Sequence, residues 1–128
     1  MMNFVLHLVG RILLASIFVI SGLAKIADWT GNSAYMAAQG MQLVPFFLAA
    51  AILVEIIGGL AIILNYKTRA IALLLFLYLI AVTLIFHDFW SVTGTERQTQ
   101  MVHFLKNLSI MGGLLILAGQ SSPRSPAG

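Results

Sequence analysis

Three polar side chains in the stretch HFLKNLSIMGGLLIL are spaced to act together. His103 and Lys106 are three residues apart, and His103 and Asn107 are four apart, so all three share one face of a helix. Histidine, lysine and asparagine donate hydrogen bonds, and an ammonium also stabilises negative charge on a bound headgroup. This pattern predicts binding of a small polar-headed amphiphile such as a quinone.

Two other apolar segments end at the same predicted depth with polar residues of their own. Lys25 ends the first segment, and His87 with Asp88 ends the third. We therefore expect one outer polar pocket formed by Lys25, His87, Asp88, His103, Lys106 and Asn107. Trp29 and Trp90 are expected to cover it, because aromatic residues gather at membrane interfaces.

Other interpretations of these side chains remain open. In an interfacial polar girdle, Lys106 only extends its ammonium to the lipid headgroups, which leaves Asn107 and the two histidines unexplained. His87 and His103 as haem ligands would rest on the histidine pair alone. A zinc site lacks an evident third ligand, so the sequence predicts neither a metal nor an intrinsic cofactor.

Arg11 and Glu55 are charged residues that lie well inside two of the apolar segments. Arg11 is about two turns into the first segment, and Glu55 is past the middle of the second. Because a charge at mid-membrane costs roughly 2.5–3.5 kcal/mol, we predict an Arg11–Glu55 ion pair between antiparallel helices, with His7 one turn away. Gly58 and Gly59 share the face of Glu55, so that face should point into the bundle. The pair either locks two helices or belongs to a working site.

Four long apolar segments must position these side chains. The chain has 128 residues, of which 60% are hydrophobic and only 9% charged, whereas a soluble domain is about 25% charged. The segments cover roughly residues 4–26, 43–64, 70–86 and 101–119, near the length that crosses a bilayer as a helix. They lack the period-2 alternation of barrel strands. The sequence therefore predicts an all-α integral membrane four-helix bundle with antiparallel up-down topology.

The connecting segments contain recognisable helix signals. Residues 28–42 predict a short interfacial helix that is capped at Asn32 or Ser33 and stops at Gly40. Asn65, in the turn between the second and third segments, is suited to the left-handed conformation that ends a helix.

Domain organisation and orientation follow from the same segments. Residues 1–119 are expected to form one transmembrane domain, and residues 120–128 a disordered tail. The side with both termini carries Lys67, Arg69 and Arg124, whereas the other carries Arg97, with Lys25 at the boundary. The positive-inside rule thus predicts cytoplasmic termini and outward-facing long loops. The scattered basic residues argue against nucleic-acid binding, and the absence of cysteine excludes thiol redox chemistry.

Several motifs together resemble a known family. GRILLASIFVISGLAKI, LVEIIGGLAIILNYKTRAIALLL, FHDFW and QMVHFLKNLSIMGGLLIL are similar to the DoxX family of small bacterial inner-membrane proteins, over roughly residues 10–118. The resemblance implies a four-helix protein of the bacterial inner (cytoplasmic) membrane with a loose link to membrane redox systems. The family takes its name from a partner of an archaeal thiosulfate:quinone oxidoreductase. The motif positions to test are Arg11, Lys25, Glu55, His87, Lys106 and Asn107.

Three functions compete at this point, and whether the chain is an enzyme stays open. The first is an accessory subunit of a membrane redox system that binds quinone or another small amphiphile in the outer pocket, with electrons from a partner enzyme. The second is a small-molecule or proton-coupled transporter gated by Glu55 with Arg11 on one side and the pocket on the other. The third is a scaffold without a ligand. Expected partners are membrane lipid, a redox-enzyme subunit and a second copy of the chain.

Overall fold

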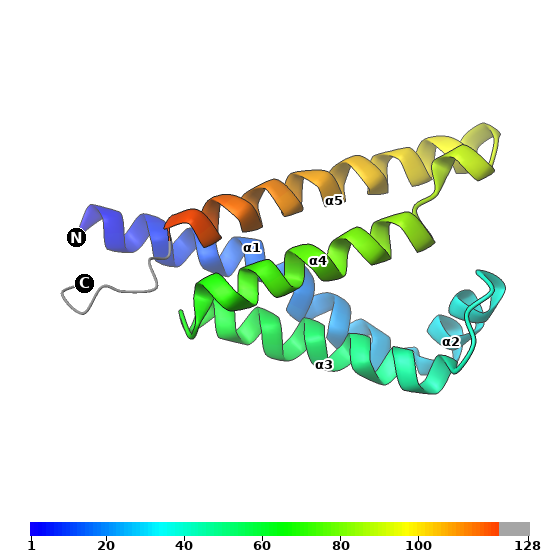
Figure 1. Ribbon diagram of the computed structural model, residues 1–128, viewed down its shortest axis with the longest axis horizontal. Helices are drawn as coiled ribbons and strands as arrows, with labels where there is room; N and C mark the ends of the chain where they lie inside the picture. The colour runs from blue at the N-terminus through cyan, green and yellow to red at the C-terminus, as the bar shows by residue number, and fades with distance from the viewer. Residues whose placement is uncertain (121–128) are drawn as a thin grey trace.

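Four long helices and two short ones make up residues 1–120, the part of the chain that the computed structural model describes (Figure 1). They are α1 (Met2–Ala27), α2 (Trp29–Ala38), α3 (Val44–Ile63), α4 (Thr68–Phe86), the 3-10 helix η1 (Phe89–Ser91) and α5 (Gly94–Gln120). The long helices α1, α3, α4 and α5 alternate in direction and are apolar enough to cross a membrane. The predicted all-α membrane four-helix bundle is confirmed.

The bounds of α5 differ from the sequence prediction at both ends. The helix begins at Gly94, seven residues before the expected start at Met101. Its first two turns are polar, so a search for apolar runs does not detect them. Gln120 is the last residue of α5, whereas it was expected to begin the tail. The rest of the predicted disordered tail lies outside the described residues.

Local signals explain where the shorter elements begin and end. The backbone of Asn65 has a φ of 57°, which confirms the left-handed conformation expected for this turn. The α2 helix begins at Trp29 rather than at Asn32 or Ser33, because the carboxylate of Asp28 accepts a hydrogen bond from the Gly31 amide at 3.1 Å and caps the helix.

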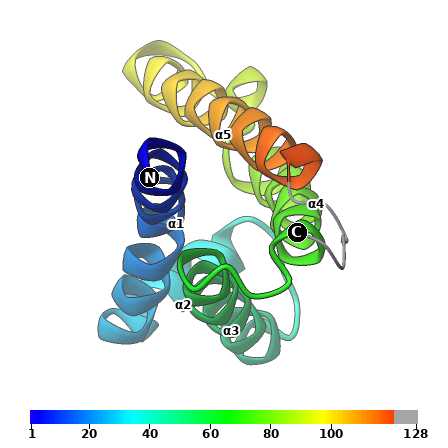
Figure 2. The ribbon, with the colours of Figure 1, turned by 90° about the vertical axis from the view of Figure 1, so that its left-hand side faces the viewer.

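Close packing of α1 on α3 forms one side of the bundle. A Cβ atom added at Gly59 would lie 2.6 Å from the Val19 side chain, so the two helices touch through glycine. Glu55, Gly58 and Gly59 are all buried, which confirms that their shared face points inward. The α4 helix packs along α5, and α1 has little contact with α5 (Figure 2).

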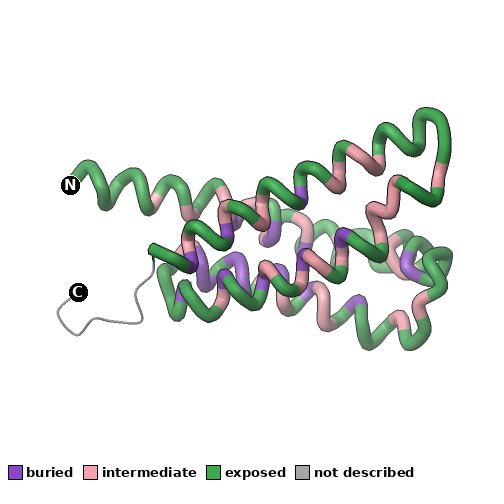
Figure 3. The backbone as a smooth tube through the Cα atoms, turned by 45° about the horizontal axis from the view of Figure 1, so that its top comes forward, coloured by how far each residue is buried: buried purple, intermediate pink, exposed green. Residues whose placement is uncertain are grey.

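The interior of the bundle is a band of apolar side chains. Its fully or nearly buried members are Ala15, Phe18, Ile62, Ala72, Leu75, Leu79, Leu114 and Ala118. Many residues on the outer faces of the long helices are exposed (Figure 3), and large apolar ones such as Leu13, Leu53, Leu77 and Ile116 are among them. Exposed apolar surface of this extent suits a surrounding of lipid rather than water.

The bundle has two ends that the following sections compare. The terminal end holds the N-terminus, the Asn65–Lys67 turn and the last turn of α5; the loop end holds α2 and η1 (Figure 1).

Candidate functional site: a polar cavity at the loop end

A cavity of about 170 Å³ at the loop end is lined by both polar and apolar side chains. Its polar lining consists of Lys25, Asn32, Tyr35, Glu55, Tyr78 and His87. These residues come from α1, α2, α3, α4 and the residue after α4, and none comes from α5. The cavity therefore depends on segments 25–87 folding against one another.

An ion pair forms part of the lining of this cavity. The Lys25 ammonium is 3.1 Å from Glu55 Oε1, and it donates a further hydrogen bond to Ser21 Oγ at 2.8 Å. The Tyr78 hydroxyl donates to Glu55 Oε2. We call this group the Lys25–Glu55–Tyr78 site. Opposite charges in contact offset part of the cost of placing either charge inside the membrane.

The internal contacts of the Lys25–Glu55–Tyr78 site do not use all of its hydrogen-bond donors and acceptors. A lysine ammonium has three N–H donors, and Lys25 uses two of them. A carboxylate offers about four acceptor positions, and Glu55 uses two. The Lys25 side chain is 23% exposed, whereas that of Glu55 is 5% exposed. The site can thus bind a further polar group through Lys25 without breaking its internal contacts.

The predicted ion pair between Arg11 and Glu55 is wrong. Glu55 pairs with Lys25, and this is the one ion pair formed within residues 1–120. Lys25 belongs to the same helix as Arg11 but lies fourteen positions further along it.

The register of α1 against α3 explains this correction. Gly22 of α1 lies against Ile56 of α3, so Gly22 is level with the neighbouring Glu55. Arg11 lies eleven residues before Gly22, or about 16 Å along the helix. Continuing the antiparallel register places Arg11 level with the Asn65–Lys67 turn. The sequence indicates the membrane depth of Arg11 and Glu55 only from the lengths of their segments. That estimate is too coarse to detect a shift of three helical turns between α1 and α3.

A second polar cluster joins α4 to α5 beside the cavity. The rings of His87 and His103 are 5.1 Å apart, and His87 Nδ1 is hydrogen-bonded to Gln100 Oε1 at 2.8 Å. The buried Asn107 amide donates to Thr83 Oγ1 at 3.1 Å. These contacts place His103 and Asn107 near the cavity without making them part of its lining.

The remaining residues expected in the pocket lie elsewhere. Asp88 accepts a hydrogen bond from Ser91 Oγ at 2.6 Å and organises η1. Lys106 is exposed, outside the cavity lining. Trp29 and Trp90 do not cover the cavity: they are 39% and 52% exposed and absent from its lining. The structure thus brings Lys25 and His87 of the predicted set into one cavity.

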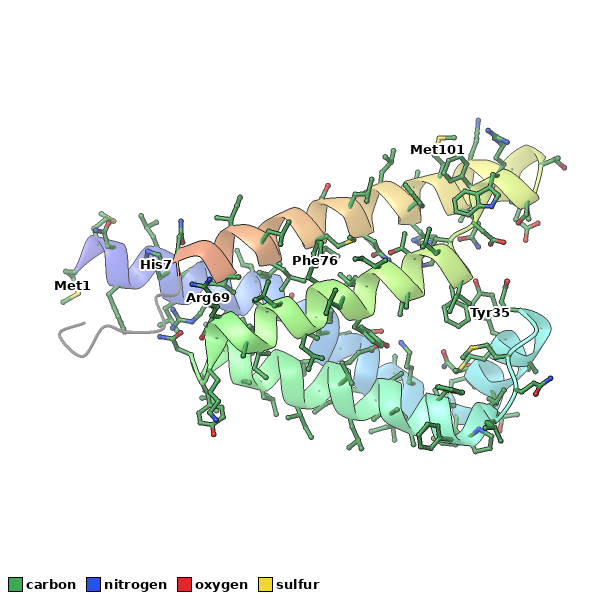
Figure 4. All side chains as sticks on the ribbon, viewed as in Figure 1. Met1, His7, Tyr35, Arg69, Phe76 and Met101 are labelled. Atoms are coloured by element: carbon green, nitrogen blue, oxygen red, sulfur yellow. The ribbon has the colours of Figure 1, made fainter. Side chains whose placement is uncertain are left out.

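Two tyrosines of the cavity were missed by the sequence analysis. Tyr78 is half-buried among apolar residues in the middle of α4. A tyrosine hydroxyl in such surroundings needs a hydrogen-bond partner, and this signal was available in the sequence. Tyr35 belongs to the short interfacial segment and was not included in the predicted pocket. Its ring stacks on Phe86 with centroids 5.5 Å apart, and its hydroxyl donates to the Phe86 carbonyl at 3.0 Å, which ties α2 to α4 (Figure 4).

The fold and this cavity define a multi-pass membrane protein with an ion pair buried in its helical bundle. The DoxX family model matches residues 6–88, which include the whole cavity lining. The chain therefore belongs to the DoxX family.

Curated relatives cover most of the chain. It is 34% identical to the inner membrane protein YphA of Escherichia coli over 89% of this chain and 81% of that protein. It is 38% identical to the inner membrane protein YqjF of the same organism over 87% of this chain and 80% of that protein. A shorter match, 32% identical over 52% of this chain, covers 21% of the ER-derived vesicles protein ERV29 of Saccharomyces cerevisiae. No solved structure matches the chain.

Proposed function

We propose that this protein binds the headgroup of a quinone, or of a similar small amphiphile with carbonyl groups, at the Lys25–Glu55–Tyr78 site. It would do so in the bacterial inner membrane, the location that the names of its two Escherichia coli relatives give. The observation that carries the proposal is the partly exposed Lys25 ammonium, which lines the cavity and, within residues 1–120, has one N–H donor unused. A quinone carbonyl accepts a hydrogen bond of that kind, and positive charge stabilises its anionic reduced forms.

The size of the cavity favours a headgroup over a whole ligand. Its volume of about 170 Å³ is smaller than the roughly 300–1,000 Å³ of most ligand pockets. Met36, Val82 and Phe86 supply an apolar part of the lining, along which a hydrocarbon tail can pass towards the lipid. A polar headgroup on an apolar tail suits this lining better than a freely soluble polar molecule does.

The role that follows is that of an accessory to a membrane redox enzyme. Reduction of a quinone to a quinol takes two electrons and two protons. Both the electrons and the protons would come from the partner enzyme, while the Lys25 ammonium donates a hydrogen bond to the headgroup and Glu55 holds Lys25 in place. If the termini are cytoplasmic, as the distribution of Lys and Arg favours, the cavity serves the outer leaflet.

Transport through the bundle receives less support from the geometry. A transport path would have to connect Glu55 with the terminal end. Between these two levels, the described helices fill the interior with the apolar side chains of Phe18, Ile62, Leu75 and Leu114.

A binding titration tests the proposal. Detergent-purified protein is titrated with short-chain ubiquinone and menaquinone, and saturable binding is expected. Ala51→Leu should abolish it by filling the cavity while leaving the ion pair in place, because Ala51 lines the cavity. The matched control Ala49→Leu changes an exposed position of the same helix and should bind normally. Lys106→Gln should also bind normally. Absence of saturable binding, or equal binding by Ala51→Leu and wild type, would refute the proposal.

A further inference from the structure

A second recess lies at the terminal end and is lined by residues of α1 and α5. It is an open groove of about 340 Å³, and its lining includes the apolar Leu6, Leu14 and Ile116 together with His7 and Arg11. Gly10 and Gly113 leave room in it because they have no side chains. We call it the Arg11 groove. It shares no residue with the cavity at the loop end.

The positive charge in this groove has no counter-ion among residues 1–120. Arg11 Nε is buried and has no hydrogen-bond partner among the described residues. A guanidinium stays protonated in proteins, so its charge persists there. The chain has four acidic side chains, Asp28, Glu55, Asp88 and Glu96. Glu55 is engaged by Lys25, and the other three lie in the loop-end segments. An anion that pairs with Arg11 must therefore come from outside these side chains.

The depth of Arg11 indicates what that anion is. The α1–α3 register places Arg11 level with the polar Asn65–Lys67 turn. A polar turn between two membrane spans marks the edge of the hydrocarbon layer, where lipid phosphates lie. His7 and Arg69 lie at the same end of the bundle (Figure 4). Basic pockets between transmembrane helices bind anionic lipid headgroups, and guanidinium matches phosphate oxygens with paired hydrogen bonds.

We propose that the Arg11 groove binds an anionic phospholipid, with the phosphate at Arg11 and an acyl chain along the apolar wall. The lining favours a phospholipid over free phosphate, because the apolar side chains of Leu6, Leu14 and Ile116 can contact an acyl chain but make no hydrogen bond to a small hydrophilic anion. Charge distinguishes it from a second copy of the chain, because the described terminal end of such a copy brings no acidic side chain to this depth.

Lipid titration of detergent-purified protein tests this proposal. Phosphatidylglycerol should raise the melting temperature saturably, and phosphatidylcholine should do so much less. Arg11→Gln should weaken the apparent affinity for phosphatidylglycerol roughly tenfold, the loss typical of one charged hydrogen-bonding contact. Arg97→Gln, at the loop end, should keep wild-type affinity. Equal effects of the two lipids, or wild-type affinity in Arg11→Gln, would overturn the proposal.

A pair of glycine substitutions tests the groove apart from the charge. Gly10 lines the groove, and a Cβ atom added there meets nothing within 4 Å, so Gly10→Leu should fold and block the acyl chain. Gly112→Leu adds the same side chain at a position that is also open but outside the groove, and it should bind lipid normally. Two further results would refute the proposal: saturation of the site by inorganic phosphate alone, or a wild-type dimer in size-exclusion chromatography with light scattering that Gly10→Leu dissociates.

Discussion

The two ends of this bundle differ in whether the cation in their recess is paired within the described chain. At the loop end, Lys25 contacts a carboxylate and a hydroxyl of its own chain, and the carboxylate is bound in turn by Tyr78. At the terminal end, Arg11 Nε is buried with no such partner in residues 1–120. A cation paired within the chain contributes to the folded structure. A cation left unpaired contributes little to it and is available for an external anion.

This contrast makes the two ends respond differently to substitution. Removing a partner at the loop end leaves the other charge buried and uncompensated, which is costly in any surrounding. Removing the charge at the terminal end breaks no hydrogen bond of Arg11 Nε. Four substitutions, in order of expected effect, test the comparison.

Glu55→Ala should have the largest effect. It leaves the Lys25 ammonium without its carboxylate, and we expect the free energy of unfolding to fall by roughly 3–5 kcal/mol. Denaturant titration in mixed micelles measures the change. The double variant Lys25→Met with Glu55→Gln removes both charges and keeps an acceptor for Tyr78, so it should recover most of the loss. No recovery would show that the charge pair is not the cause.

Gly59→Ala should come next, because its added methyl group would lie 2.6 Å from Val19 where α1 and α3 touch. Overpacking of this kind costs about 1–3 kcal/mol. Gly112→Ala is the matched control in α5, where a methyl group meets nothing within 4 Å. It should stabilise the helix by about 0.5–1 kcal/mol. Equal melting temperatures for both variants would contradict the close contact at Gly59.

Tyr78→Phe should have an intermediate effect. It removes one hydrogen bond to the Glu55 carboxylate and keeps the ring, so we expect a loss of about 1–2 kcal/mol in the same unfolding assay. Tyr66→Phe provides the comparison, because Tyr66 is 60% exposed and should tolerate the change. A Tyr78→Phe protein as stable as wild type would show that Lys25 alone satisfies Glu55.

Arg11→Gln should have the smallest effect on stability. In an uncharged detergent without added lipid, we expect the free energy of unfolding to change by less than about 0.5 kcal/mol. A thermal-denaturation series beside Glu55→Ala measures both ends under one condition. A loss of several kcal/mol from Arg11→Gln would mean that Arg11 is paired within the protein, and the contrast between the ends would fail.

Much of the fold could be predicted because a helix that crosses a lipid bilayer needs a long apolar segment, which is visible in the sequence. Asn65 and the inward face of Glu55 with Gly58 followed from local backbone preferences and helical spacing, and both are confirmed. The polar start of α5 at Gly94 could not be found by the same criterion, because hydropathy detects only the part of a helix inside the membrane.

The site was predicted less well, because side-chain partners depend on register. Nothing in the sequence fixes how far α1 slides along α3, and a shift of fourteen residues exchanges Arg11 for Lys25 as the partner of Glu55. Tyr78 was overlooked although an isolated tyrosine in an apolar helix is itself a signal. Lys106 was included in the predicted pocket because an ammonium can bind an anionic headgroup. In the structure it lies on α5, outside the cavity lining.

The absence of α5 from the cavity lining has a consequence for how the protein can be rebuilt. The cavity belongs to residues 25–87, whereas α5 forms one wall of the Arg11 groove. A chimera whose last helix is taken from YphA should thus keep every side chain that lines the loop-end cavity. In the Arg11 groove, the wall formed by α5 would instead come from YphA. The exchange would replace a wall of the Arg11 groove, whereas at the loop-end cavity it would change only α5 side chains behind the lining, such as Gln100, the hydrogen-bond partner of His87.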